Sequence, residues 1–278
     1  MRIIAKVLES KDDSIADIHL SVSKVKTFDQ CKRKYKYSYI EKLPHKEWDF
    51  QVFGSFLHEV LEIFHGTLKK NGSSDYIDVM NNAFSDACKS WKKKLSVKQK
   101  QDGFKIMQTY INQMYASEVL PKIIDVEKPF YIDLNGKVML NGFIDRVQKD
   151  NDGIIHVADY KTTKNKKYLK DFFQLNTYAY ALMTEDKKIE KVRTSFILLR
   201  HNMELITKEY NRKQALSVGK KFLEYADKID SEKVWRPSPQ FLCKYCDYLD
   251  HCDAGKQCLI KKGILENDSD NEFGVSKW

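Results

Sequence analysis

The sequence predicts an α/β protein: a mixed central β-sheet flanked by helices, with a helical N-terminal lobe and a C-terminal cysteine segment. Three observations predict this class. Apolar residues recur at helical spacing between about residues 52 and 117, and from residue 123 onward β-branched and aromatic runs alternate with turn signals. The third observation is FLCKYCDYLDHC at 241–252, which holds three of the chain's six cysteines.

The N-terminal lobe is expected to be helical. The serines of SVSKVKTFDQ suit the N-cap of a short helix, and a second segment follows Cys31. Apolar residues at helical spacing predict a helix over 52–70, and Asn71-Gly72 gives it a stop signal. Two further helices are expected over 75–95 and 97–117.

The central region has the period of strands before helices return. Turn signals NGK and DNDG separate its first three strands. We expect strands over 123–134, 137–149 and 153–161, a helix over 168–186, strands over 191–200 and 203–210, and a helix over 211–230. WRPSPQ then leads into the cysteines.

Composition restricts the class of protein. No apolar run reaches the roughly 20 residues that cross a bilayer, and MRIIAKVLESKDDS lacks the apolar core of a signal peptide. We therefore expect a reducing, cytoplasmic location, where clustered cysteines indicate metal or redox chemistry. The net charge of +9 favours a polyanionic partner, although a solvated lysine-rich surface explains it equally well. The tail from about Asn267 reads as disordered.

The hairpin NGFIDRVQKDNDGIIHVADYKT, residues 141–162, brings two carboxylates together. With a three-residue turn at 151–153, counting outward places Asp145 opposite Asp159. Directly opposed side chains are roughly 4.5–5.5 Å apart, and like charges there are destabilising. A divalent cation held by oxygen ligands would compensate the repulsion. A surface hairpin with an ordinary Asp–Lys ion pair is the alternative.

Two further side chains suit the same site. Lys161 lies two residues after Asp159, on the same strand face, where an ammonium could polarise a water or a phosphate oxygen. His58 and Glu62 are spaced i,i+4 on the helix over 52–70. His58 could complete a metal shell, although a lone histidine on an apolar face is often structural.

These residues resemble the PD-(D/E)XK nucleases, in their RecB-like branch. GFIDRV and DYK match the active-site core, FGSFLHEVLE resembles the helix that carries a histidine ligand, and QLNTY is similar to the Q-x-x-x-Y motif. The proline of the family name is replaced by Ile144, as is common in this branch. The resemblance implies a restriction-endonuclease-like core. It also implies that His58, Asp145, Asp159 and the Tyr160 carbonyl bind Mg²⁺ or Mn²⁺, with Lys161 catalytic and Gln174 and Tyr178 orienting the site or contacting DNA.

The cysteines extend the resemblance to the members that carry a 4Fe–4S cluster, such as the AddB nuclease domain and the CRISPR-adaptation nucleases. By that resemblance Cys31 is the fourth ligand beside Cys243, Cys246 and Cys252. Cys258 competes for a ligand place, and zinc held with His251 is the alternative metal. Cys88 lies on an apolar helical stripe and is expected to be a buried thiol.

The predicted function is a metal-dependent DNA nuclease, an exonuclease on single strands or free ends, stapled by an iron–sulfur cluster. No G-x(4)-G-K-[ST] loop occurs, so the chain carries no helicase motor of that type. It is expected either to degrade single strands or free ends by itself or to serve as the nuclease partner of a helicase, recombination or CRISPR-type protein. The basic run Lys32, Arg33, Lys34 and Lys36 could bind phosphates, or its interleaved tyrosines could simply pack this lobe. A non-catalytic DNA-binding or redox iron–sulfur scaffold is the alternative function.

The expected organisation has four parts. Residues 1–120 form the N-terminal segment and helical lobe, which carries Cys31 and His58, and residues 121–232 form the nuclease core. Residues 233–262 form the iron–sulfur segment, and residues 263–278 form the disordered tail.

Overall fold

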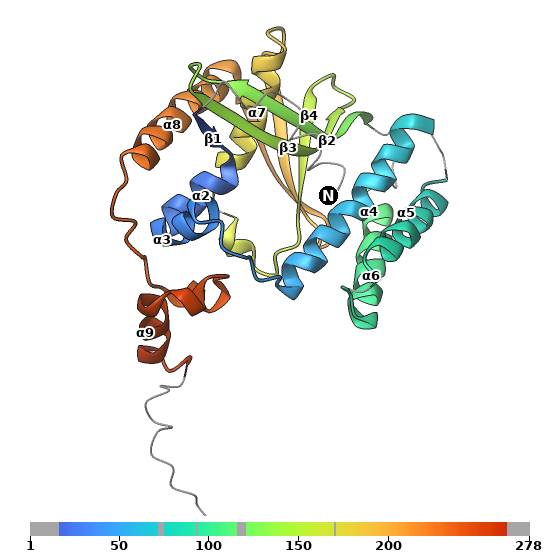
Figure 1. The fold of residues 1–278 in the computed structure, drawn as a ribbon. Coiled ribbons are helices and arrows are strands. Elements are labelled where there is room, and N and C mark those ends of the chain that lie inside the picture. The colour runs from blue at the N-terminus through green and yellow to red at the C-terminus, as the bar shows by residue number, and fades with distance from the viewer. Residues whose placement is uncertain (1–16, 72–74, 93, 116–120, 170, 266–278) are drawn as a thin grey trace, which may run out of the picture. The chain divides into compact units, whose positions relative to one another are not determined.

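The computed structural model describes residues 17–71, 75–92, 94–115, 121–169 and 171–265 (Figure 1). The chain forms two compact units. The first contains the described part of 1–22 together with 48–226, and the second contains 23–47 together with the described part of 227–278. From residue 266 onward, the tail predicted to be disordered lies outside the described residues.

The first unit is built on a six-stranded mixed sheet. Its strands are β1 (Ile18–Leu20), β2 (Lys122–Asp133), β3 (Val138–Lys149), β4 (Ile155–Lys161), β5 (Lys191–Leu198) and β6 (Glu204–Asn211). The order is β1-β3-β4-β5-β6, and β2 pairs with the other edge of β3. β1–β3 and β4–β5 are parallel, whereas β2–β3, β3–β4 and β5–β6 are antiparallel.

The hairpin of β3 and β4 has the predicted turn. The Asp150 N–H donates to the Ile154 carbonyl at 3.0 Å, and Gly153 takes the left-handed conformation with φ of 82°. The register is therefore the predicted one, with Arg146 paired to Ala158. On the same edge of β3, β1 pairs with residues 138–140 and β4 with residues 146–149. Among the described strands none pairs with the stretch between them, where β3 and β4 separate.

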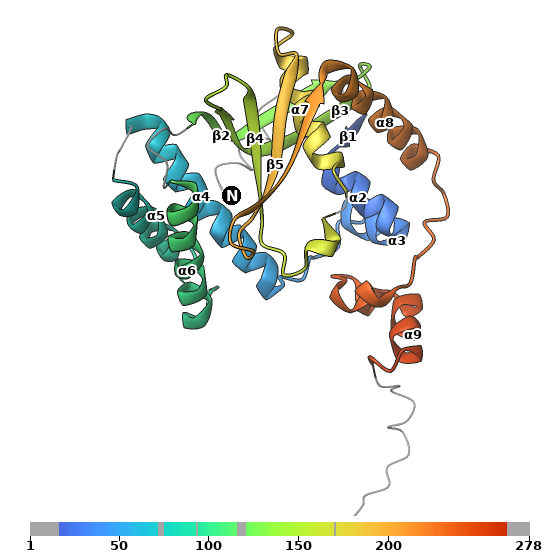
Figure 2. The same cartoon turned by 180° about the vertical axis from the view of Figure 1, so that it is seen from behind.

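Three helices cover one face of this sheet. α4 (Asp49–Asn71), α5 (Tyr76–Ser90) and α6 (Val97–Met114) lie side by side in both views (Figures 1 and 2). Their apolar faces and the sheet residues Ala158, Tyr160 and Ile197 form one buried cluster. α6 begins at a capping box in which Ser96 and Gln99 bond each other's backbone N–H groups. Burial of the apolar helical stripes explains why these segments are helical as predicted.

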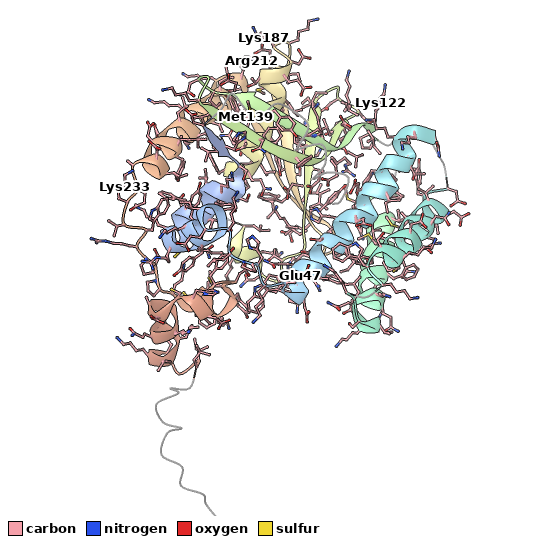
Figure 3. All side chains as sticks on the ribbon, in the orientation of Figure 1. Glu47, Lys122, Met139, Lys187, Arg212 and Lys233 are labelled. Carbon is pink, nitrogen blue, oxygen red and sulfur yellow. The ribbon has the colours of Figure 1, made fainter. Side chains whose placement is uncertain are left out.

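α7 (Phe173–Glu185) and α8 (Arg212–Asp230) belong to the opposite face. α7 packs over β4 and β5, beside Asp159 and Phe196. α7 is preceded by a 3₁₀ turn, η2 (Lys166–Tyr168), and so begins later than the sequence predicts. Arg212, labelled in Figure 3, donates to the carbonyls of Met183, Asp186 and Ile189 and so satisfies the C-terminal end of α7.

The second unit joins two segments far apart in the sequence. Its elements are α2 (Val22–Gln30), α3 (Lys32–Tyr35), the π-turn η1 (Lys36–Ile40), the 3₁₀ turns η3 (Phe241–Tyr245) and η4 (Leu249–His251), and α9 (Asp253–Lys261). The ring of Tyr35 is buried and stacks on Trp235 with centroids 5.9 Å apart. Tyr248 is fully buried, and its hydroxyl lies 2.8 Å from His45 Nδ1. Aromatic packing therefore joins the two segments.

The α/β class and each long element of the first unit are confirmed. Among the described strands and α-helices, two short ones are additional to the prediction: β1, which is only three residues long, and α9. Among the described residues, no helix has both the length and the apolar character needed to span a membrane.

Candidate active site

Three carboxylates lie in a row across β2, β3 and β4. The register of β2 and β3 places Glu127 across from Asp145. The register of β3 and β4, continued one residue past the pair Arg146–Ala158, places Asp145 across from Asp159. Like charges on neighbouring strands repel, so the local backbone and side chains must accommodate them.

Asp145 lies at the point where β3 and β4 separate. Its Oδ2 accepts a hydrogen bond from the Tyr160 N–H at 2.8 Å, in place of a ladder partner. The same oxygen is 3.5 Å from Nδ1 of His58, whose Nε2 donates to the Tyr160 carbonyl at 3.0 Å. In the neutral imidazole, Nδ1 therefore presents its lone pair toward a carboxylate oxygen. A cation between the two atoms would satisfy both.

Helix α4 approaches this edge of the sheet closely at a glycine. A Cβ added at Gly54 would lie 3.0 Å from Oγ1 of Thr162, directly after β4. A larger residue would require the Thr162 side chain or the helix to shift by a few tenths of an ångström, because that separation is tighter than ordinary van der Waals contact. His58 lies one turn further along the helix, so Gly54 sets how closely its imidazole approaches Asp145.

Glu127 is a candidate that the sequence analysis missed. Its φ of 47° is in the left-handed region, which costs a non-glycine residue on the order of 1–3 kcal/mol. A carboxylate oxygen of Glu127, a ring nitrogen of His58 and a carboxylate oxygen of Asp145 all lie within 4.8 Å of one another. Counting from the NGK turn, as was done for the DNDG turn, would have placed Glu127 across from Asp145. The strained backbone has no signal in the sequence.

Asp159 belongs to a closed ring of side chains. Its Oδ2 lies 2.5 Å from Lys161 Nζ, and Lys161 donates to Gln174 Oε1 at 3.1 Å. Gln174 Nε2 donates to the Tyr178 hydroxyl at 2.8 Å, and this hydroxyl donates to Asp159 Oδ1 at 3.2 Å. The ring joins β4 to the first two turns of α7. The predicted residues Asp159, Lys161, Gln174 and Tyr178 are thus brought together.

The carboxylates perturb one another. Burial and then repulsion from Asp159 raise the pKa of Asp145, against the lowering effects of His58 and Lys161. Burial and then repulsion from Asp145 raise the pKa of Glu127 to about 8. Burial and repulsion from Glu59 also raise the pKa of Glu62. Such a cluster retains protons near neutral pH unless a cation compensates it.

The donor set fits a hard divalent cation. Two carboxylates and one imidazole converge, and oxygen ligands with one nitrogen suit Mg²⁺ or Mn²⁺. Oδ2 of Asp159 is buried without a hydrogen bond, although Lys161 lies beside it. Its charge is paired with the Lys161 ammonium, so a cation at this position would share the oxygen with Lys161. The predicted ligands His58 and Asp145 are therefore together, whereas Asp159 faces Lys161 and the Tyr160 carbonyl accepts from His58.

A buried guanidinium lies on the other face of the sheet. Arg146 is 3% exposed, and its Nη1 donates to Tyr110 Oη at 2.7 Å and lies 3.0 Å from Nε2 of His65. The ring of Tyr160 stacks on His65 and lies 5.8 Å from the guanidinium carbon. The partners of this charge among the described residues are neutral phenols and an imidazole. Burial and then Arg146 hold the pKa of His65 well below its usual value.

The second unit collects the predicted cluster cysteines. Sγ of Cys31 accepts the backbone N–H groups of Lys34 and Ser238, each at 3.4 Å, and Sγ of Cys243 accepts the Gln240 N–H at 3.3 Å. A Cβ added at Gly255 would lie 3.5 Å from Cys252 Sγ and 3.8 Å from Cys243 Cβ. Burial raises the pKa of Cys246, and the nearby Cys243 adds to this. Cys258 lies on α9, and Cys88 is half-buried against the cluster of the first unit.

The basic run has partners inside the second unit. Lys32 pairs with Glu232, Arg33 Nε donates to the Trp235 carbonyl at 2.9 Å, and Lys36 pairs with Glu41 at 2.9 Å. Of the interleaved tyrosines, Tyr35 is buried against Trp235, and the Tyr37 hydroxyl donates to the His251 carbonyl at 2.8 Å. These aromatic rings therefore pack within the second unit, as the alternative interpretation of the basic run expects. Lys34, beside Cys31, is half-buried.

Known proteins of two kinds are similar to this chain. One subunit of the ATP-dependent helicase/deoxyribonuclease of Streptococcus agalactiae serotype Ia is 27% identical over 199 residues, covering 63% of this chain and 17% of that protein. The corresponding protein of Streptococcus pyogenes serotype M6 is 38% identical over 66 residues, 22% of this chain and 6% of that protein. The chain thus spans less than a fifth of these relatives.

A solved structure shares the fold. A candidate exonuclease from Eubacterium rectale aligns over 93% of this chain and 94% of its own, with a TM-score of 0.51 and 12% identity. The family model described as the PD-(D/E)XK nuclease superfamily matches residues 19–253. This match covers most of the chain, including the carboxylate row, the Lys161 ring and the four predicted cluster cysteines. The chain therefore belongs to the PD-(D/E)XK nuclease superfamily.

Proposed function

We propose that this chain is a divalent-metal-dependent deoxyribonuclease that hydrolyses phosphodiester bonds, acting as an exonuclease on single strands or free ends. The observation that supports it best is the convergence of Asp145, Glu127 and His58 beside the Asp159–Lys161 pair. Such strongly perturbed carboxylates are typical of catalytic and metal sites.

Asp145, Asp159 and His58 are the proposed ligands of Mg²⁺ or Mn²⁺, and Glu127 is added to them on geometry. The Tyr160 carbonyl remains a proposed further ligand, because an oxygen that accepts from His58 keeps a second lone pair. When bound, the ion supplies charge stabilisation at the phosphate and lowers the pKa of a water. Binding it also removes the repulsion among the three carboxylates.

Lys161 is proposed to act on the phosphate or the attacking water. Its ammonium is held between Asp159 and Gln174, and such a charge stabilises the negative charge that develops on phosphate oxygens during hydrolysis. Gln174 and Tyr178 are proposed to orient the site, because their hydrogen bonds connect Lys161 back to Asp159. Gln174 is half-buried and remains a proposed DNA contact, whereas Tyr178 is buried and is proposed only to orient the site.

The four cysteines Cys31, Cys243, Cys246 and Cys252 are proposed to hold a 4Fe–4S cluster. Backbone N–H groups that point at cysteine sulfurs support this, because such bonds stabilise and tune thiolate-bound clusters. The cluster would join 23–47 to 227–265 and so hold the second unit together. Zinc remains the alternative occupant. In this organisation the segment 1–120 carries both His58 and Cys31, the segment 121–232 is the nuclease core, and the segment 233–262 supplies the other three cluster ligands.

The proposed partner is DNA together with a helicase-type protein. The relatives are named as parts of an ATP-dependent helicase/deoxyribonuclease, and the +9 charge suits a polyanion. A recombination or CRISPR-type assembly is a further proposed setting. Lys32, Arg33, Lys34 and Lys36 are kept as proposed phosphate contacts, although three of them would first exchange their internal partners.

End-labelled single- and double-stranded oligonucleotides test the function directly. With Mg²⁺ or Mn²⁺, the parent protein should release labelled products, and Asp145→Ala should release none. Lys161→Ala should still show metal-induced thermal stabilisation but lose most turnover. An Asp145→Ala protein that cleaves at the parent rate would refute the site. A parent that binds DNA without cleaving it under any metal would support the scaffold alternative.

A further inference from the structure

A chain of aromatic and cationic contacts leads away from the catalytic lysine. Lys161 Nζ lies 5.0 Å from the ring centre of Phe196, which is directly across the sheet from Asp159. The Phe196 ring stacks on Phe172 with centroids 6.0 Å apart and planes 27° apart. Lys208 Nζ lies 3.7 Å from the ring centre of Phe172.

The fold fixes these side chains on one face of the sheet. Lys208 of β6 pairs with Thr194 of β5, two residues from Phe196, so Lys208 and Phe196 point to the same side. Phe172 is the residue before α7, whose first turn carries Gln174. Phe196 is 1% exposed, whereas Phe172 is half-buried and Lys208 is exposed. The outer part of this chain is therefore accessible, and its inner part is anchored.

Lys208 has no carboxylate partner among the residues the structure describes. Its ammonium instead rests on the ring of Phe172, where a nucleobase would stack. Lysine is flexible, and its contact with an aromatic ring at an exposed site is weak. It can therefore move from the ring to a neighbouring phosphate when a base arrives.

We propose that Phe172 and Lys208 form a nucleotide subsite a few nucleotides from the cleaved bond, for an unpaired base and its phosphate. The proposal rests on the proposed nuclease function, and it assigns a single-stranded substrate to the site. Unpaired bases can stack on an aromatic ring whatever their identity, whereas paired bases keep their faces within the duplex. Stacked bases are spaced roughly 3.4 Å apart, so the contacts of 5.0, 6.0 and 3.7 Å extend over a few nucleotides from Lys161.

Binding to a single-stranded oligonucleotide in EDTA tests the subsite without cleavage. The probe carries 2-aminopurine near one end, whose fluorescence falls when it stacks. Phe172→Leu keeps an apolar side chain over Phe196 but removes the stacking face, so the affinity should fall by roughly tenfold and the quenching should disappear. Phe172→Trp should restore both. Lys208→Gln should reduce the slope of log K against log salt by about 0.7.

Two exposed residues provide matched controls. Phe50 is 54% exposed and stacks on Trp48, and Lys137 lies in the exposed turn between β2 and β3. Phe50→Leu and Lys137→Gln should bind like the parent, and circular dichroism should show that every variant is folded. The subsite would be overturned if Phe172→Leu bound the oligonucleotide as tightly as Phe50→Leu does. It would also be overturned if Phe172→Leu lost as much affinity for duplex DNA as for the single strand. A parent that binds in this manner but never cleaves would instead refute only the nuclease function.

Discussion

Removing the hydroxyl group of Tyr178 is the most informative single change in this site. The hydroxyl accepts from Gln174 at 2.8 Å and donates to Asp159 at 3.2 Å, and Tyr178→Phe removes both bonds without creating a cavity. Asp159 is 1% exposed, so water does not readily replace the lost donor. A buried group left unsatisfied costs roughly 1–3 kcal/mol, which is the expected loss in the free energy of unfolding.

The effect on cleavage should exceed the effect on DNA binding. Gln174 loses its anchor, so Lys161 loses the fixed position between Gln174 and Asp159. We expect kcat to fall by about tenfold, which is about 1.4 kcal/mol of transition-state stabilisation, with little change in KM. Urea unfolding in EDTA measures the stability, and single-turnover cleavage with Mn²⁺ measures the rate.

Tyr180→Phe is the matched control on the same helix. Tyr180 is 8% exposed and its hydroxyl faces Gly219 of α8 instead of the carboxylates. This variant should cleave at the parent rate. If Tyr178→Phe matches the parent in both stability and rate, the closed ring of hydrogen bonds does not position Lys161. The proposed orienting role of Tyr178 is then wrong.

Three other predictions test separate parts of the structure. Folding raises the pKa of Glu127 from 4.5 to about 8, so ionisation of this carboxyl opposes folding. The resulting loss in the free energy of unfolding grows as the pH rises between these two values. Glu127→Gln should therefore raise the metal-free unfolding midpoint at about pH 9 but not at about pH 4, and equal shifts at both would contradict this. Gly54→Ala should destabilise the protein and weaken metal-induced stabilisation by pressing on Thr162. Gly66→Ala, in the same helix with open space around it, should gain roughly 1 kcal/mol. Anaerobically purified protein should show broad visible absorbance that Cys31→Ser abolishes and Cys88→Ser retains, whereas a colourless parent with stoichiometric zinc would defeat the iron–sulfur assignment.

Local signals predicted most of the first unit. Helical and strand periods are set by which face of each segment is buried, so α4 to α8 and β2 to β6 could be read directly. The DNDG turn predicted the register of β3 and β4, and therefore the proximity of Asp145 and Asp159. β1 could not be predicted, because three residues carry no period and their pairing to β3 is decided by tertiary contact.

The missed part of the site has a physical reason. A glutamate in a strand normally indicates an exposed position, and nothing in IIDVEKPF signals that its backbone turns left-handed at Glu127. The start of α7 was also predicted too early, at 168, because the 3₁₀ turn η2 precedes the helix, which begins at Phe173. Boundaries of this kind depend on packing and not on propensity.

The buried guanidinium of Arg146 makes the two faces of the sheet respond differently to acid and base. An arginine does not deprotonate in proteins, and its charge together with burial keeps His65 neutral. Burial also raises the pKa of Tyr160 well above its usual value and raises that of Tyr115. His65, Tyr160 and Tyr115 therefore keep their protons unchanged through the neutral range. The group around Arg146 thus provides a constant electrostatic background against which Glu127 and Asp145 gain and lose their protons.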